Sequence, residues 1–270
     1  MKNEQYRRRE DRRPRAPREE ITEQEQEDRL EGRNALTEAL RSGRTIDKVF
    51  IAAGETDRGL QRLAAQAKEA GAVIVPVDRR KLDAMSTTHA HQGVIAQAAA
   101  REYATVDEIL EEAQSRGETP LLVICDELSD PHNLGAIIRS AECAGAHGVI
   151  IPKRRSVGLT AVVAKASAGA IEYMKVARVT NINATITELK EKGVWIFGTA
   201  AEGSVPMYQA NLTVPAAIVI GSEGDGMSRL VRQNCDVTVH IPMKGKITSL
   251  NASAAATVLL YEAVRQRLEG

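Results

Sequence analysis

The sequence of 270 residues is poor in aromatic side chains and in cysteine, and it contains no long apolar run. Aromatic residues make up 3% of the chain, too few for an RNA-binding groove that stacks bases on Phe and Tyr. The three cysteines are far apart without a CxxC pair, which excludes a disulfide framework or zinc ribbon and suits a reducing cytosol. No segment approaches the roughly 18 apolar residues of a membrane span, and the arginine-rich N-terminus does not resemble a signal peptide. A cytoplasmic protein without membrane contact is therefore expected.

Several motifs of cofactor sites and nucleophiles are also missing. The chain has no GxxxxGK[ST] phosphate loop, no GxGxxG between a strand and a helix, no GxSxG and no HExxH. Asp126, Asp130 and His132 could be metal ligands, but a loop with Asx turns is favoured because nothing nearby completes a coordination set. His89 and His91 could also be metal ligands, but a position at the polar edge of a loop is favoured. The sequence thus predicts no metal site.

The net charge is zero, but the charges are unevenly distributed. Residues 1–18 hold eight basic and three acidic side chains, whereas residues 19–31 hold seven acidic side chains and Arg29 alone. Residues 1–30 are too polar to form a core, which predicts a disordered tail. Its basic half is compatible with a phosphate-binding arm, and equally with a solvated segment partly neutralised by its own acidic half.

From about residue 32, short apolar runs alternate with helix-period stretches, a pattern typical of layered α/β domains. Residues 31–98 are expected to form one compact unit, residues 99–120 a linker made of a connecting helix and loop, and residues 121–270 a second unit. The second unit opens with the unbroken apolar run Leu121–Cys125, typical of a strand covered on both faces of its sheet. The elements expected in the first unit are helices over 35–40 and 59–70 and strands over 49–52, 73–77 and 93–97. Those expected in the second unit are helices over 134–144 and 251–268 and further strands over 149–151, 195–197, 217–220 and 237–241.

Three polar segments of the second unit are expected beside strand ends or helix starts. In the first, Asn133 and Gly135 occupy a turn before a helix that carries Arg139 between apolar neighbours. Such an arginine usually needs an anionic partner, which could be a structural carboxylate, a phosphate or a reacting oxygen.

The second segment, Gly221-Ser-Glu223-Gly-Asp-Gly, directly follows an apolar strand. Its three glycines permit close approach of a ligand at the carboxyl end of the strand. The third segment runs from Ile241-Pro-Met243 to Ser249-Leu250-Asn251 and leads into the last helix. Taken singly, each of the three segments is better explained without chemistry: the first by an arginine paired with a structural carboxylate, the second by a tight turn and the third by helix capping.

Together and in this order, the three segments resemble the SpoU-type branch of the SPOUT superfamily, the AdoMet-dependent RNA 2′-O-ribose methyltransferases. The resemblance covers about residues 121–267 and rests on three strings: Asn133-Leu-Gly-Ala-Ile-Ile-Arg139-Ser-Ala, Gly221-Ser-Glu223-Gly, and Ile241-Pro-Met243 followed by Ser249-Leu250-Asn251-Ala-Ser253. Upstream, Glu31-Gly32-Arg33-Asn34-Ala35-Leu36 and His91-Gln92-Gly93-Val94 resemble the small substrate-binding domain of the bacterial large-subunit rRNA guanosine-2′-O members.

The resemblance implies an α/β fold with a small N-terminal substrate-binding domain and a SPOUT catalytic domain that ends in a trefoil knot. It also implies a homodimer with the active site near the interface, AdoMet as cofactor and no metal. The implied reaction is methylation of a ribose 2′-hydroxyl in ribosomal RNA, at a guanosine of the 23S molecule. A tRNA methyltransferase of the same fold and a non-catalytic RNA-binding module are the alternatives.

The resemblance further assigns roles to individual residues. Arg139 would act on the 2′-hydroxyl electrostatically, because a guanidinium with a pKa above about 12 is a poor base. Asn133 would orient the ribose or Arg139, and Glu223 would position Arg139 or another donor. Ser249 and Asn251 would shape the substrate and cofactor side. The residues expected to hold the adenosine and methionine parts of AdoMet are Thr199, Gly221, Ile241, Met243 and Leu250.

Overall fold

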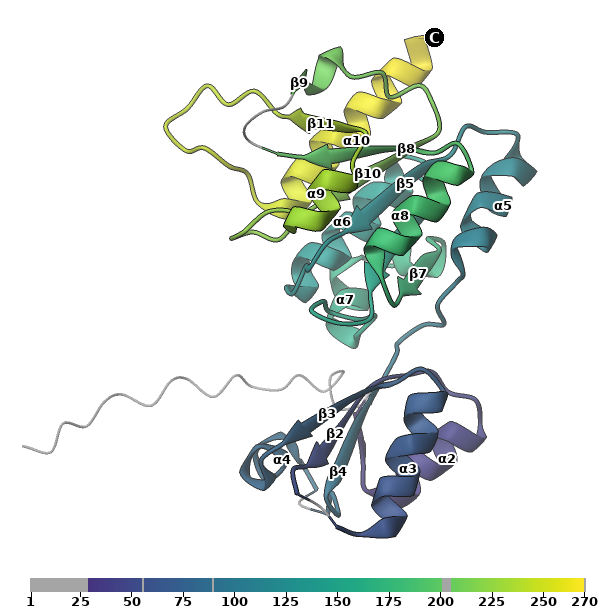
Figure 1. The fold of residues 1–270 in the computed structure, drawn as a ribbon, viewed down its shortest axis with the longest axis vertical. Helices are drawn as coiled ribbons and strands as arrows, with labels where there is room; N and C mark the ends of the chain where they lie inside the picture. The colour runs from purple at the N-terminus through teal and green to yellow at the C-terminus, as the bar shows by residue number, and fades with distance from the viewer. Residues whose placement is uncertain (1–28, 55, 89, 201–204, 270) are drawn as a thin grey trace, which may run out of the picture.

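The computed structural model describes residues 29–269, except residues 55, 89 and 201–204. They form two α/β units joined by an extended segment, which confirms the expected fold class (Figure 1). The predicted tail up to residue 28 and the position of His89 are outside the described residues. None of the helices in the described part combines the length and hydropathy needed to cross a bilayer.

The N-terminal unit is built on a four-stranded sheet in the order β1-β4-β2-β3. The strands are β1 (Arg29–Glu31), β2 (Ile46–Ala52), β3 (Val73–Val77) and β4 (Val94–Ala98). Pairing of β1 with β4 is antiparallel and includes Arg29 and Leu30, so the expected tail boundary at residue 30 is wrong by two residues. The polar residues of β1 form a strand because the neighbouring strand β4 offers unpaired backbone groups for hydrogen bonding.

Helices cover both faces of this sheet. On one face, α2 (Arg33–Arg41) and α3 (Arg58–Glu69) bury Leu36 and Leu60 against the strands. On the other face, α4 (Arg79–Met85) buries Leu82 in a smaller cluster. The expected helix over 59–70 corresponds to α3, which begins where the Asp57 carboxylate accepts the Leu60 N–H at 2.9 Å.

The C-terminal unit contains a parallel seven-stranded sheet in the order β7-β6-β5-β10-β8-β11-β9. Its central strands β5 and β10 are buried throughout, as expected for a sheet covered on both faces. The strands are β5 (Leu121–Cys125), β6 (Gly148–Pro152), β7 (Val176–Val179), β8 (Trp195–Thr199), β9 (Val205–Pro206), β10 (Ala216–Ile220) and β11 (Val237–His240).

Two sets of helices enclose this sheet (Figure 1). One face is covered by α6 (Pro131–Cys143), α7 (Ala161–Ala166) and α10 (Ala252–Glu269), and the other by α5 (Val106–Arg116), α8 (Ile182–Glu191) and α9 (Arg229–Asn234). Short 3₁₀ turns occur at Ala170–Glu172 and Met207–Gln209. Because α5 buries Ile109 in the core of the C-terminal unit, the helix expected within residues 99–120 belongs to that unit, and only the first residues of this segment connect the two units.

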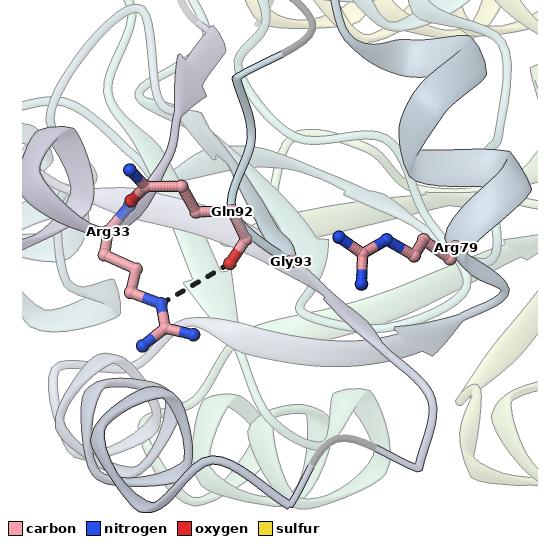
Figure 2. Close-up of a pocket in the computed structure, with 4 residues that line it drawn as sticks. All are labelled: Arg33, Arg79, Gln92 and Gly93. Atoms are coloured by element: carbon pink, nitrogen blue, oxygen red, sulfur yellow. Dashed lines mark hydrogen bonds between the residues drawn. The ribbon is translucent and has the colours of Figure 1, made fainter.

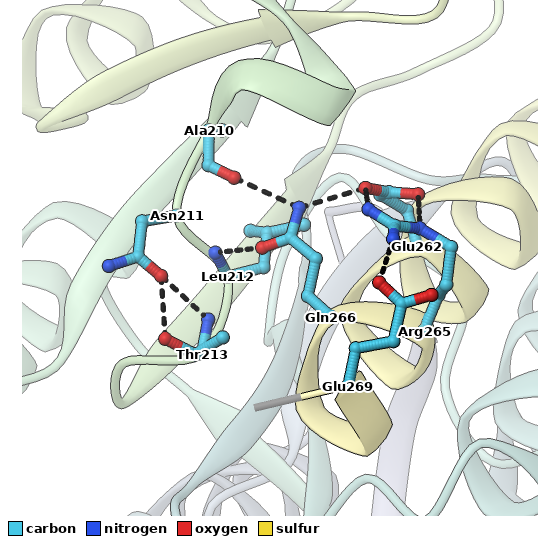
Figure 3. Close-up of polar contacts among 8 residues, drawn as sticks. All are labelled: Ala210, Asn211, Leu212, Thr213, Glu262, Arg265, Gln266 and Glu269. Carbon is cyan, nitrogen blue, oxygen red and sulfur yellow. Dashed lines mark hydrogen bonds and ion pairs between the residues drawn. The ribbon is translucent and has the colours of Figure 1, made fainter.

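The last helix is tied to the segment before β10 by side chains near its C-terminus (Figure 3). The Gln266 amide accepts the Leu212 N–H at 2.8 Å and donates to the Ala210 carbonyl at 3.0 Å. Arg265 pairs with Glu262 and Glu269 on the same helix. The two Gln266 hydrogen bonds hold the C-terminal part of α10 against the segment before β10.

A buried polar cluster connects the two units. Arg178 on β7 donates to Asp47 on β2, from Nη1 to Oδ1 at 2.6 Å and from Nη2 to the carbonyl at 3.0 Å. Tyr103, in the connecting segment, donates its hydroxyl to Asp47 Oδ2 at 3.0 Å. The Asp47 and Arg178 side chains are only 1% and 5% exposed. Burial raises the pKa of Asp47, although the Arg178 guanidinium opposes this effect.

Glu31, at the end of β1, holds the loop after α4. Its carboxylate accepts the Ser86 hydroxyl at 2.6 Å, the Thr87 N–H at 2.7 Å and the Thr88 N–H at 3.1 Å. Burial disfavours the charged form, but these hydrogen bonds outweigh burial and lower the pKa of Glu31 to about 2.

The Glu31 carboxylate is therefore expected to remain ionised from pH 6 down to pH 3. Its stabilising effect should be complete above the ordinary glutamate pKa of about 4.3 and be lost as the pH falls toward 2. An NMR titration of the Glu31 side-chain carboxyl carbon measures this directly. A Glu31 midpoint close to the ordinary glutamate pKa of about 4.3 would contradict the assignment.

Candidate active site

The three polar segments singled out in the sequence meet at one edge of the parallel sheet. Asn133 donates its side-chain N–H to Glu223, and Asn251 donates from Nδ2 to Asn133 Oδ1 at 2.9 Å. These residues come from α6, from the loop after β10 and from the loop before α10. Because β5, β10 and β11 belong to one parallel sheet, the loops after them share its carboxyl edge.

Asn133 is part of the first turn of α6 and is buried. The helix begins with Pro131, and its N-cap Asp130 accepts the His132 N–H at 2.9 Å. The expected helix start at residue 134 is therefore three residues late, because proline at the first helical position suits a helix start. Gly135 faces α7: a Cβ there would be 2.5 Å from the Cβ of Ala166, so this glycine permits close helix packing.

The loop carrying Glu223 is a tight turn. Ser222 and Gly226 exchange backbone hydrogen bonds at 3.0 and 3.1 Å. A Cβ at Gly221 would be 2.1 Å from the Gly226 carbonyl carbon, so the chain folds back on itself at this point. The Asp126 carboxylate after β5 accepts the Ser228 N–H at 2.6 Å and anchors the end of the turn. Asp130 thus forms the expected local Asx turn, whereas Asp126 holds a loop 102 residues away, a contact that the Asx-turn interpretation did not predict.

Asn251 has two roles at the start of α10. Its Oδ1 accepts the Ser253 N–H at 2.9 Å, which caps the helix, while its Nδ2 reaches Asn133. A further contact joins the same two helices, since the hydroxyls of Ser140 and Thr257 are 2.7 Å apart. Sequence reasoning missed this pair, because an isolated hydroxyl on a helix gives no signal of its partner. The capping role of Asn251, in contrast, is visible in the sequence.

Arg139 and Ser249 are exposed and do not join this network. Glu223 contacts Asn133, and no carboxylate among the described residues pairs with Arg139. No described carboxylate neutralises the Arg139 guanidinium, so it is available to bind an anionic ligand. The three segments thus bring together two amide side chains and a carboxylate, and Arg139 is on the same helix as Asn133.

The residues expected to hold a cofactor surround the same edge of the sheet. The hydroxyl of Thr199, at the end of β8, donates to the Val219 carbonyl at 2.9 Å and joins β8 to β10. Ile241 is half-buried against the main core, whereas Met243 and Leu250 are 37% and 41% exposed. Within the part of the chain that the structure describes, residues 242–250 form no backbone–backbone hydrogen bond. Their N–H and C=O groups are therefore free to bind a ligand.

The fold is that of a known methylase family. Residues 120–261 match the model of the SpoU rRNA Methylase family, and residues 29–104 match the model for RNA 2′-O ribose methyltransferase substrate binding. The chain belongs to the SpoU rRNA methylase family, which confirms the resemblance seen in the sequence strings.

Individual relatives cover nearly the whole chain. A Bacillus subtilis (strain 168) protein, YacO, whose name places it among TrmH-family tRNA/rRNA methyltransferases, is 49% identical over 90% of this chain and 97% of its own. The 23S rRNA (guanosine-2′-O-)-methyltransferase RlmB of Ralstonia nicotianae is 45% identical over 88% and 95%. The crystal structure of the SpoU methyltransferase AviRb from Streptomyces viridochromogenes with AdoMet superposes with a TM-score of 0.58, at 27% identity over 90% and 91% of the chains.

Proposed function

We propose that this protein transfers a methyl group from AdoMet to the ribose 2′-hydroxyl of a guanosine in 23S ribosomal RNA. The observation that carries the proposal is the hydrogen-bonded series Asn251–Asn133–Glu223, which unites the three segments, with the exposed Arg139 on the same helix as Asn133. Both domain matches and the 45% identity to RlmB support RNA as the substrate and a guanosine as the target.

The residues of the site suit an AdoMet molecule. Loop 242–250 offers unpaired backbone groups for the polar edge of an adenine, and Met243 and Leu250 offer apolar contact for its ring. Thr199, Gly221 and Ile241 shape the adjacent strand ends. When bound, AdoMet supplies a methyl group that its sulfonium charge already activates.

The chain's own residues align and activate the hydroxyl. The Arg139 guanidinium stabilises negative charge developing on the 2′-oxygen and binds the adjacent phosphate, which accepts the hydroxyl proton. Asn133 orients the ribose, and its bonds to Glu223 and Asn251 fix the direction of its amide. Ser249 contributes a hydroxyl on the substrate side. The enzyme acts as a homodimer, a proposal that the exposure of Arg139 supports, because a partner subunit can complete its surroundings.

The decisive experiment follows tritium from labelled AdoMet into protein-free rRNA and, separately, into tRNA, and then maps the labelled nucleotide. We expect one ribose-methylated guanosine in 23S rRNA. Label confined to tRNA would replace this proposal by a tRNA methyltransferase of the same fold. Absence of label from both RNAs, together with no AdoMet binding by calorimetry, would indicate a non-catalytic RNA-binding module.

A further inference from the structure

A hollow at the outer edge of the N-terminal unit has the chemistry of an anion site. Its volume is about 380 Å³, and its lining residues are Arg33, Arg79, Gln92 and Gly93 (Figure 2). These residues do not belong to the network around Asn133. Three of them come from the start of α2 and from the turn before β4, and Arg79 comes from the start of α4.

Sheet topology explains why these segments converge. Strands β2 and β3 are parallel, and β4 runs antiparallel to β2. The last residues of β2 and β3 and the first residues of β4 therefore lie at the same end of the sheet. Strand β1 is antiparallel to β4 and ends at this same edge, where it leads into α2. The opposite end of β2 carries Asp47, which contacts Arg178 of the C-terminal unit. From Asp47 to Ala52 the strand rises roughly 17 Å, so the hollow faces away from the contact between the units.

Arg33 is held in place but keeps donors available. Its Nε donates to the Gln92 carbonyl at 3.4 Å, and its Nη1 donates to Asp57 Oδ2 at 3.0 Å. A guanidinium has five N–H donors, so these two bonds fix its plane without using its full capacity. The Gln92 side chain accepts the Arg33 backbone N–H at 3.3 Å through Oε1, which leaves its own N–H donors for another group.

Arg79 approaches from the other side of the turn. Figure 2 shows its guanidinium pointing toward Gln92 and Gly93 from the side opposite Arg33. Arg79 is exposed, and no carboxylate of the described residues pairs with it. Two guanidinium groups therefore line the hollow, and among the described residues only that of Arg33 pairs with a carboxylate, that of Asp57.

The turn between the two arginines is rigid. Gln92 has a φ of 49°, in the left-handed region that few residues other than glycine adopt. The Gly93 N–H donates to His91 Nδ1 at 3.0 Å, and His91 Nε2 is bonded to Asp83 at 2.9 Å. A strained turn held by a buried histidine keeps Gln92 fixed between the arginines.

We propose that this hollow binds a backbone phosphate of the RNA substrate, away from the ribose that is methylated. Two guanidinium groups and an amide donor fit phosphate oxygens, with which arginine forms paired, charge-assisted hydrogen bonds. The inference rests on the proposed function, since it takes the methylated RNA as the occupant. It assigns to Arg33, Arg79 and Gln92 a binding role distinct from the chemistry near Arg139.

The test compares the affinity of the full-length chain for protein-free 23S rRNA at several salt concentrations. The variants Arg79→Gln and Arg33→Gln each remove one charge, and Arg62→Gln on the exposed face of α3 is the charge-matched control. We expect the Kd to rise about three- to tenfold for each hollow variant, and the slope of log Kd against log salt to fall by about 0.7–0.9 per lost contact. For Arg62→Gln we expect both to stay unchanged.

A second readout separates binding from chemistry. With AdoMet present, the hollow variants should raise the KM for RNA while leaving kcat at saturating RNA unchanged. Wild-type affinity and salt slope for Arg79→Gln, which has no structural partner to lose, would overturn the inference. An equal loss in Arg62→Gln would also overturn it, because the effect would then reflect net charge alone. Binding is measured without cofactor, so RNA binding without methyl transfer would refute the proposed function and leave this site in place.

Discussion

Replacing Arg139 with alanine is expected to lower the rate of methyl transfer by a factor of about 10²–10³, the usual loss when a donor to a developing oxyanion is removed. The side chain is exposed on α6, and no carboxylate in the described part of the chain neutralises it. Its removal should leave AdoMet affinity, measured by calorimetry, at the wild-type value. Single-turnover methylation of 23S rRNA at saturating AdoMet gives the rate.

Two further variants define the role of this arginine. Arg139→Lys keeps the charge but loses the planar pair of donors, so its rate should fall between those of the wild type and Arg139→Ala. Glu142→Gln, at an exposed position on the same helix, should leave the rate unchanged. An undiminished rate in Arg139→Ala would show that the guanidinium does not act on the reacting oxygen.

Replacing Asp47 with alanine is expected to weaken the contact between the two units by about 3–5 kcal/mol, the usual loss when one partner of a buried ion pair is removed. The variant leaves the Arg178 guanidinium buried without its carboxylate and removes the acceptor of the Tyr103 hydroxyl. Small-angle X-ray scattering should show a larger radius of gyration. Hydrogen exchange should speed up at the Leu159 amide, which donates to the Tyr103 hydroxyl at 2.9 Å.

The double variant Asp47→Ala/Arg178→Ala should lose less than the sum of the two single variants, because it leaves no unpaired buried charge. The control is Glu38→Gln, in a surface pair with Arg41 whose side chains are 70% and 72% exposed, where a change below about 1 kcal/mol is expected. Wild-type scattering and exchange in Asp47→Ala would show that this cluster does not determine how the units are held together.

The local sequence pattern was sufficient to predict the position of several helices and strands. Strands β3 and β5 have the boundaries expected from their apolar runs, and α3 differs from its expected range by one residue at each end. These segments combine a clear periodicity with a glycine, proline or aspartate near an end, so local interactions define them. The parallel sheet with helices on both faces also follows from such runs.

Other elements depend on contacts that the sequence does not display. No element was expected between residues 152 and 194, yet this segment forms α7, β7 and α8. Strand β7 has four residues, including the polar Arg178, and becomes a strand through its pairing with β6. Asp47 could not be recognised as buried, because its partners Tyr103 and Arg178 are 56 and 131 residues away.

The candidate site was predictable only from the combination of its segments. Asn133 and Glu223 are 90 residues apart, and Asn133 and Asn251 are 118 apart, so no local pattern indicates that they meet. The resemblance to one family supplied that information. The trefoil knot and the role of Arg139 are predictions that rest on that same resemblance.

The place of β10 between β5 and β8 has a consequence for synthesis on the ribosome. Residues 29–98 can complete their sheet as soon as they emerge, whereas β5 and β8 must wait for a strand made after both of them. Until β10 arrives, their unpaired backbone edges are open to mispairing with other chains. Such late, long-range insertion makes folding slow. The nascent protein can therefore display a finished N-terminal unit well before the Asn133–Glu223–Asn251 site can form.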